Sequence, residues 1–245
     1  MEKAPDVSSQ LVHEIHSYYH DLQYFVGALI QLSTITHAIE DNAESLRSRL
    51  SEINNFSVIM SAKTNFLKYL TSEVGDLVMR RIAVHRVIKR VISGARQIAA
   101  SQKKLALRVR LEGESYGEIF GPDVFEIIPY LLLENAIKYS PNHNQVVLAL
   151  HEQANVIVCR LVSLGPELHP AEESKIFESG FRGENAIRLT EMGTGMGLFH
   201  AKCATEMYRG SITVRQRREG PPIVINGIPF RQTEFTLNLP KAMPG

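Results

Sequence analysis

Cysteine is scarce in this sequence, since only Cys159 and Cys203 occur among 245 residues. Two distant cysteines cannot form the disulfide framework of a small secreted domain, so we expect a reducing, cytoplasmic location. We also expect no apolar leader of the secretory type, because residues 1–10, MEKAPDVSSQ, are mostly polar. No window holds 18 consecutive apolar residues, so we expect no membrane span.

The sequence also lacks a strong charge of either sign. Lys and Arg number 27 against 26 Asp and Glu, a formal net charge of +1. A chain without a basic excess is poorly equipped to hold many phosphates, so we expect no nucleic-acid partner. The length and the hydrophobic content of 44% suffice for one large or two modest domains with hydrophobic cores.

The first third of the chain carries helical periodicity. Apolar residues recur at steps of three and four over residues 8–37 and again from Leu46 to Leu70, with a turn near residues 38–43. This pattern predicts a helical hairpin over residues 8–74. A hairpin alone exposes its apolar stripe, and two copies bury it as a four-helix bundle, so we expect a homodimer.

The pattern changes from about residue 76. Short β-rich runs occur at residues 105–113, 145–150, 155–162, 211–216 and 234–239, and helical runs at 83–102, 123–139 and 196–208. This alternation predicts an α+β sandwich over residues 76–241, with a mixed, mostly antiparallel sheet and helices on one face.

Four motifs follow one another in this second region. They are 131-LLLENAIKYSP-141, 163-SLGPEL-168, 174-SKIFESGFRG-183 and 193-GTGMGL-198. Glycines before a helix allow positive φ and close approach to an anion, which the free N–H groups of the helix attract. In this order, the motifs resemble the N, G1, F and G2 boxes of the ATP-binding domain of sensor histidine kinases, in the GHKL superfamily.

The resemblance implies a site for ATP and Mg²⁺. Asn135 would hold Mg²⁺ against the phosphates, Lys138 would neutralise phosphate charge, and Tyr139 would pack near the adenine. A methyl group introduced by Gly195→Ala is expected to point toward the phosphates. The resemblance also implies nucleotide contacts by Ser163, Gly165, Phe177, Arg182, Gly193, Thr194, Gly195, Gly197 and Leu198.

Three positions depart from the family pattern. The G1 aspartate that accepts a hydrogen bond from the adenine amino group is Ser163 here, so the charge-assisted contact is lost. The second G1 glycine is Glu167, which is expected to disturb that turn. Leu131 stands where related ATP-hydrolysing proteins carry a glutamate base, which disfavours attack by water.

His20, followed by Asp21, resembles the phosphoacceptor H box. The resemblance implies that His20 Nε2 attacks the γ-phosphate while Asp21 orients the ring and raises its basicity. His13, His16 and His20 share one helix face, so a metal site and three ordinary surface histidines are alternatives. Tyr24, four residues after His20, replaces the Thr or Asn typical of members that dephosphorylate their partner.

These motifs together predict a homodimeric, cytoplasmic histidine kinase that passes its phosphoryl group to a response-regulator receiver domain. One alternative is a degenerate member that serves as a phosphotransfer intermediary or binding scaffold. Another is a protein-serine kinase of the anti-sigma type, which the N-terminal hairpin disfavours. The sequence identifies neither the input signal nor the cognate partner, nor whether transfer occurs in cis or in trans.

Overall fold

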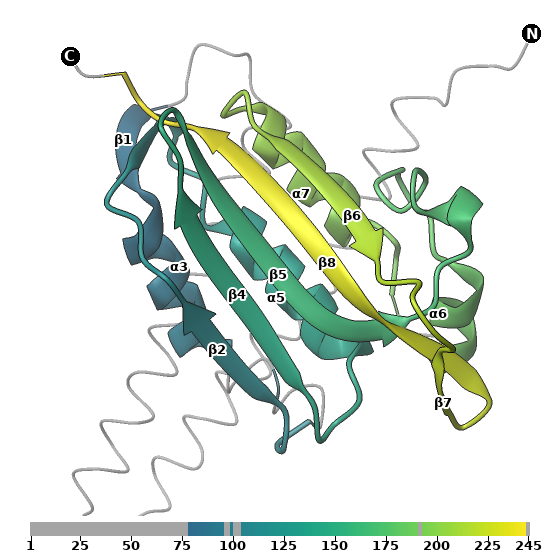
Figure 1. Ribbon diagram of the computed structural model, residues 1–245. Helices are drawn as coiled ribbons and strands as arrows, with labels where there is room; N and C mark the ends of the chain where they lie inside the picture. Colours follow the sequence, from purple (N-terminus) through teal and green to yellow (C-terminus); the bar gives the residue numbers. More distant parts are fainter. Residues whose placement is uncertain (1–77, 96–98, 100–103, 191–192, 244–245) are drawn as a thin grey trace, which may run out of the picture. The chain divides into compact units, whose positions relative to one another are not determined.

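The computed structural model describes residues 78–95, 99, 104–190 and 193–243 (Figure 1). The predicted hairpin over residues 8–74, and with it His20 and Asp21, lies outside the described residues. Within the described ranges, no helix is both long and apolar enough to cross a membrane.

A six-stranded sheet forms the body of the domain. Its strands are β2 (Arg108–Glu112), β4 (Gln145–Glu152), β5 (Val156–Pro166), β8 (Ile228–Pro240) and β6 (Ser211–Gln216) in spatial order, with β7 (Ile223–Ile225) paired to β8. The β2–β4 pair is parallel and the remaining pairs are antiparallel. The sheet is therefore mixed and mostly antiparallel, as the sequence predicts.

Helices α3 (Val84–Ser93), α5 (Ile127–Tyr139) and α7 (Gly197–Glu206) cover one face of this sheet (Figure 1). The α+β architecture is thus confirmed. The sequence did not predict four of the elements: the short strand β7, the strands β1 (Met79–Ala83) and β3 (Glu118–Pro122), which form a separate antiparallel pair, and the short helix α6 (Glu184–Leu189). A 3₁₀ turn, η1 (Pro170–Glu172), precedes α6.

Helix α5 lies at the centre of the helical layer, and most of its residues are buried. Pro129 is tolerated in the first turn, where backbone N–H groups have no acceptor within the helix. The helix ends at Tyr139 because Ser140 precedes Pro141, which disfavours the helical conformation, and Ser140 is extended (φ −74°, ψ 145°). The polar end of α5 is therefore fixed by local sequence.

Candidate functional site

The polar residues of α5 lie on the side of the helix that faces away from the core. Asn135, Lys138 and Tyr139 are half-buried, whereas Ala136 and Ile137 between them are buried. Spacings of three and four residues bring 135, 138 and 139 onto one face. The Lys138 ammonium lies 5.2 Å from the centroid of the Tyr139 ring, within cation–π range. These polar interruptions in an apolar helix therefore form one continuous surface.

Lys138, Arg182 and Gly193 converge from three separate motifs. A side chain at Gly193 would overlap the Lys138 ammonium, and the Arg182 Nε lies 3.8 Å from the ideal Cβ position of Gly193. Burial lowers the pKa of Lys138, and the nearby Arg182 guanidinium lowers it further, while Glu134 opposes both effects. Two half-buried cations beside a glycine backbone can bind an anion.

Lys104 adds a third cation that sequence reasoning missed. Its ammonium donates to the backbone oxygens of Lys138 and Ser140, at the negative end of α5. Burial, and secondarily the charge of Lys138, lowers the pKa of Lys104 to about 8. Cations are common at helix C-termini, but Lys104 lies 34 residues before Lys138, so no local sequence pattern indicates that the two residues are in contact.

The glycine turn before α7 contacts the F box rather than open space. Gly193 and Gly195 have φ of +130° and +73°, which L-residues rarely adopt. A Cβ at Gly195 would lie 2.6 Å from the Gly180 carbonyl and 2.7 Å from the Phe181 oxygen. The expectation that an alanine methyl at 195 points toward phosphates is therefore corrected: it would collide with the F-box backbone.

The other predicted residues of the F and G2 boxes have structural contacts. Phe177 is buried and packs edge-to-face on Phe235, with ring centroids 6.4 Å apart. The Thr194 hydroxyl accepts from the Met196 amide at 3.4 Å, just before α7. Gly197 lies beside Leu131 on α5, and Leu198 is half-buried in the first turn of α7. These contacts tie the turn to the helical layer.

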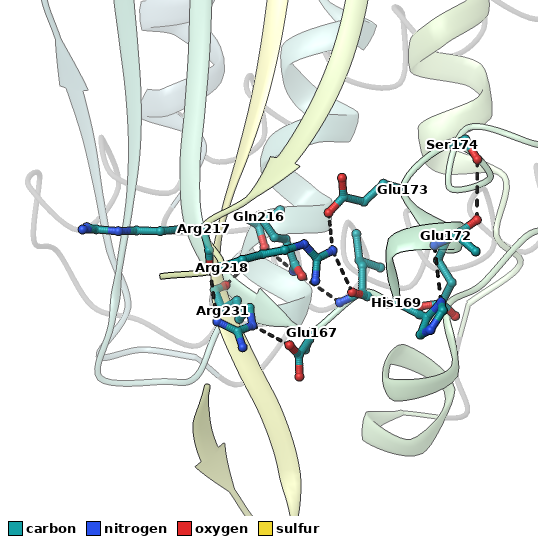
Figure 2. Close-up of polar contacts among 12 residues, drawn as sticks. Glu167, His169, Glu172, Glu173, Ser174, Gln216, Arg217, Arg218 and Arg231 are labelled. Carbon is teal, nitrogen blue, oxygen red and sulfur yellow. Dashed lines mark hydrogen bonds and ion pairs between the residues drawn. The ribbon is translucent and has the colours of Figure 1, made fainter. Parts of the chain in front are cut away.

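The G1 motif lies at the end of β5, and Glu167, directly after this strand, forms three contacts. Its carboxylate pairs with Arg231 of β8 (Figure 2). Its amide donates to the Pro229 oxygen at 2.8 Å, and its carbonyl accepts from Asn185 at 2.8 Å. Among the described residues, Arg209 and Asn226 are the only non-glycine residues with positive φ, so Glu167 occupies no conformation that requires glycine. The expected disturbance of the turn is therefore not seen, because Glu167 has an ordinary backbone conformation and its carboxylate is paired with Arg231.

We expect Glu167→Ala to destabilise the domain by about 1–3 kcal/mol, since Arg231 would be left partly buried without its carboxylate. The two side chains are only 24% and 12% exposed. Glu219→Ala is the matched control, because the Glu219–Arg217 pair is 73% and 66% exposed and should contribute about 0–0.5 kcal/mol. Urea unfolding of both variants checks this difference, and equal losses would contradict it.

Helix α6 is anchored at three points. The Glu184 amide donates to Glu172 at 2.9 Å, Asn185 donates to the Glu167 carbonyl, and Arg188 donates to the Gly227 carbonyl at 3.2 Å. The sequence predicted no helix here, because a helix of six residues is not stable by propensity alone. Its helical form depends on these tertiary contacts.

A pocket of about 280 Å³ opens between η1, α6 and the end of β6. Arg218 crosses it, donating to Glu173 and, at 3.1 Å, to the Leu168 carbonyl (Figure 2). None of the residues predicted to contact nucleotide lines this pocket. Its lining residues are Glu167, Leu168, His169, Pro170, Glu172, Glu184, Asn185 and Arg218.

Residues 125–243 match the protein family described as histidine kinase-, DNA gyrase B- and HSP90-like ATPase. The sensor-like histidine kinase SenX3 of Mycobacterium tuberculosis is 24% identical over 232 residues, which cover 90% of this chain and 52% of that protein. The heme sensor protein HssS of Staphylococcus aureus is 24% identical over 230 residues, covering 93% and 45%. The chain thus spans about half the length of the curated relatives it matches.

Solved structures share the fold. The mycobacterial sensor histidine kinase MprB superposes with a TM-score of 0.56 at 20% identity, covering 67% of this chain and all of that one. Full-length ShkA, solved in complex with AMPPNP, gives a TM-score of 0.53 at 14% identity, covering 88% and 46%.

Proposed function

Residues 125–243 form a domain of the histidine kinase-, DNA gyrase B- and HSP90-like ATPase family, and we propose that the chain is a histidine kinase of two-component signalling. It binds Mg-ATP on α5 and the glycine turn and transfers the γ-phosphoryl group to His20. The phosphohistidine then passes the group to an aspartate of a receiver domain. Because ATP is a cytoplasmic substrate, we propose a cytoplasmic location for this domain, and we propose that the chain forms a homodimer through residues 8–74.

The observation that carries this proposal is the convergence of Lys138, Arg182 and Gly193. Phosphoryl transfer needs mainly positioning and neutralisation of charge, and two desolvated cations beside a glycine backbone supply both. Asn135, half-buried on the same face of α5 as Lys138, offers the single amide oxygen that a phosphate-bound Mg²⁺ needs. No cluster of three or more His, Cys, Asp or Glu suited to a metal occurs in the described part of the chain. This fits an ion held largely by the nucleotide.

In the proposed transfer, the lone pair of His20 Nε2 attacks the γ-phosphorus. The bond from that phosphorus to the β–γ bridging oxygen breaks, and ADP leaves with the electron pair. Asp21 accepts the Nδ1 proton in a hydrogen bond and stabilises the cationic ring that forms. Leu131 supports transfer over hydrolysis, because this buried side chain beside Gly197 cannot remove a proton from water.

We expect Lys138→Met to weaken Mg-ATP binding about 10–100-fold, because a desolvated cation facing the phosphates is lost. Asn135→Ala should weaken binding in the presence of Mg²⁺ more than in its absence, since it removes only the metal ligand. Lys89→Met is the matched control, because Lys89 is exposed on α3. Calorimetry of the full chain measures all three, and unchanged affinity in both site variants would refute the site.

A further inference from the structure

Three buried polar side chains form a row across the sheet beneath the helical layer. Ser163 of β5 is paired with Thr233 of β8, and Thr233 is paired in turn with Gln216 of β6. They are 6%, 5% and 3% exposed. Cross-strand partners share a face, and Leu161, two residues before Ser163, is a core residue. The row therefore continues the core-facing side of three neighbouring strands.

Two members of the row are committed to protein partners. Gln216 donates both amide hydrogens, to the Pro166 carbonyl and to the Thr233 hydroxyl, each at 2.8 Å, and its oxygen accepts from the Leu168 amide at 2.7 Å. The Thr233 hydroxyl then donates to the Arg231 carbonyl at 3.2 Å. Gln216 thus holds the G1 turn in place and has no donor left for a ligand.

Ser163 is the uncommitted member. Among the described residues, no hydrogen bond joins its hydroxyl to another group, although only 6% of the residue is exposed. Gly165 follows on the same face of β5, and its missing side chain leaves open the space beside the Thr233 hydroxyl, which a Cβ would approach to 3.1 Å. A hydroxyl without a protein partner on a residue that is only 6% exposed, next to space kept open by glycine, is a feature expected of a ligand contact.

We propose that Ser163 makes this site accept 6-oxopurine as well as 6-aminopurine nucleoside triphosphates. This inference rests on the proposed nucleotide site. A carboxylate at this position can only accept, so it selects the amino group of adenine and repels the O6 of guanine or hypoxanthine. A serine hydroxyl rotates and serves as either donor or acceptor, so it matches both classes of base. Thr233 keeps one acceptor lone pair and adds no charge.

The test measures calorimetric affinities of Mg-ATP, Mg-GTP and Mg-ITP for the full chain. We expect the three affinities of the wild type to agree within about tenfold. Ser163→Asp should shift the ATP-to-GTP ratio by about 100-fold toward ATP, because the base oxygen then faces an acceptor. Ser163→Ala should lower the affinities for Mg-GTP and Mg-ITP by about tenfold and the affinity for Mg-ATP by less. This second variant tests the inference even if the buried aspartate of Ser163→Asp prevents folding.

Ser115→Ala is the matched control. Ser115, between β2 and β3, is also buried, but its hydroxyl donates a hydrogen bond to Glu152 of β4. It should leave the ratio of nucleotide affinities unchanged. A wild type that prefers ATP by 100-fold or more overturns the inference while leaving the proposed function intact. Failure of all three nucleotides to bind, in wild type and variants alike, overturns the proposed function and the inference with it.

Discussion

The His20→Gln variant is expected to take up no phosphoryl group from γ-labelled Mg-ATP, while its affinity for Mg-ATP stays at the wild-type value. Glutamine cannot form the phosphoramidate bond, so the loss should be complete rather than partial. The proposed nucleotide contacts of Lys138, Arg182 and Gly193 lie within residues 125–243, which match the ATPase family, whereas His20 lies outside that range. Label on the wild type should be acid-labile and alkali-stable, as expected of phosphohistidine.

His13→Gln and His16→Gln are the controls for this prediction, since neither histidine is followed by the aspartate and the amphipathic run together, as His20 is. Both variants should label like the wild type. If the His20→Gln variant still takes up label, His20 is not the phosphoacceptor, but the proposed kinase activity stands. A wild type that binds Mg-ATP but never labels would favour the degenerate scaffold instead.

Gly195→Ala is expected to lower Mg-ATP affinity by about 100-fold or more. The added Cβ would lie 2.6 Å from the carbon and oxygen of Gly180, which are backbone atoms and cannot rotate away. Either the glycine turn or the F-box turn must therefore move. Because Arg182 belongs to the F box, either movement changes the distance between Arg182 and Gly193. Displacement of about 1 Å in a positioned phosphate site is enough for a loss of this size.

Gly180→Ala provides a matched control. Gly180 has φ of +74°, nearly the same as Gly195, but a Cβ there meets nothing within 4 Å. It should therefore show only the backbone strain, about 1–2 kcal/mol in thermal or urea unfolding, and keep Mg-ATP affinity within a few-fold. If the two variants lose affinity equally, strain rather than the contact between the two boxes explains the effect.

The sequence predicts those elements whose signals are local. The C-terminus of α5 is correctly placed at Tyr139 because Pro141 follows Ser140, and β6 is found with the predicted bounds. Only the second half of β8 is predicted, since the strand begins at Ile228 and the predicted run at residue 234. The predicted helix over residues 83–102 begins as expected; α3 ends at Ser93, and Ala95 and Ala99 beyond Gly94 are again helical.

What the sequence misses depends on distant contacts. Helix α6 has too few residues to show a period, and it is held by Glu172, Glu167 and Gly227. The Glu167–Arg231 pair joins positions 64 residues apart. The motif order alone indicated Lys138, Arg182 and Gly193 as one site, and the structure brings these three together. No described contact joins Asn135 or Ser163 directly to them, so their roles stay predictions.

The pairing of Glu167 with Arg231 has an evolutionary consequence. A glutamate here without the arginine, or the arginine without the glutamate, leaves a partly buried charge uncompensated, so either single replacement passes through a less stable intermediate. In a protein with glycine at position 167, an arginine at position 231 has no carboxylate there to pair with. We therefore expect the two positions to vary together among relatives of this chain, glycine with a neutral residue and glutamate with arginine. A survey of such sequences would show the mixed combinations to be depleted.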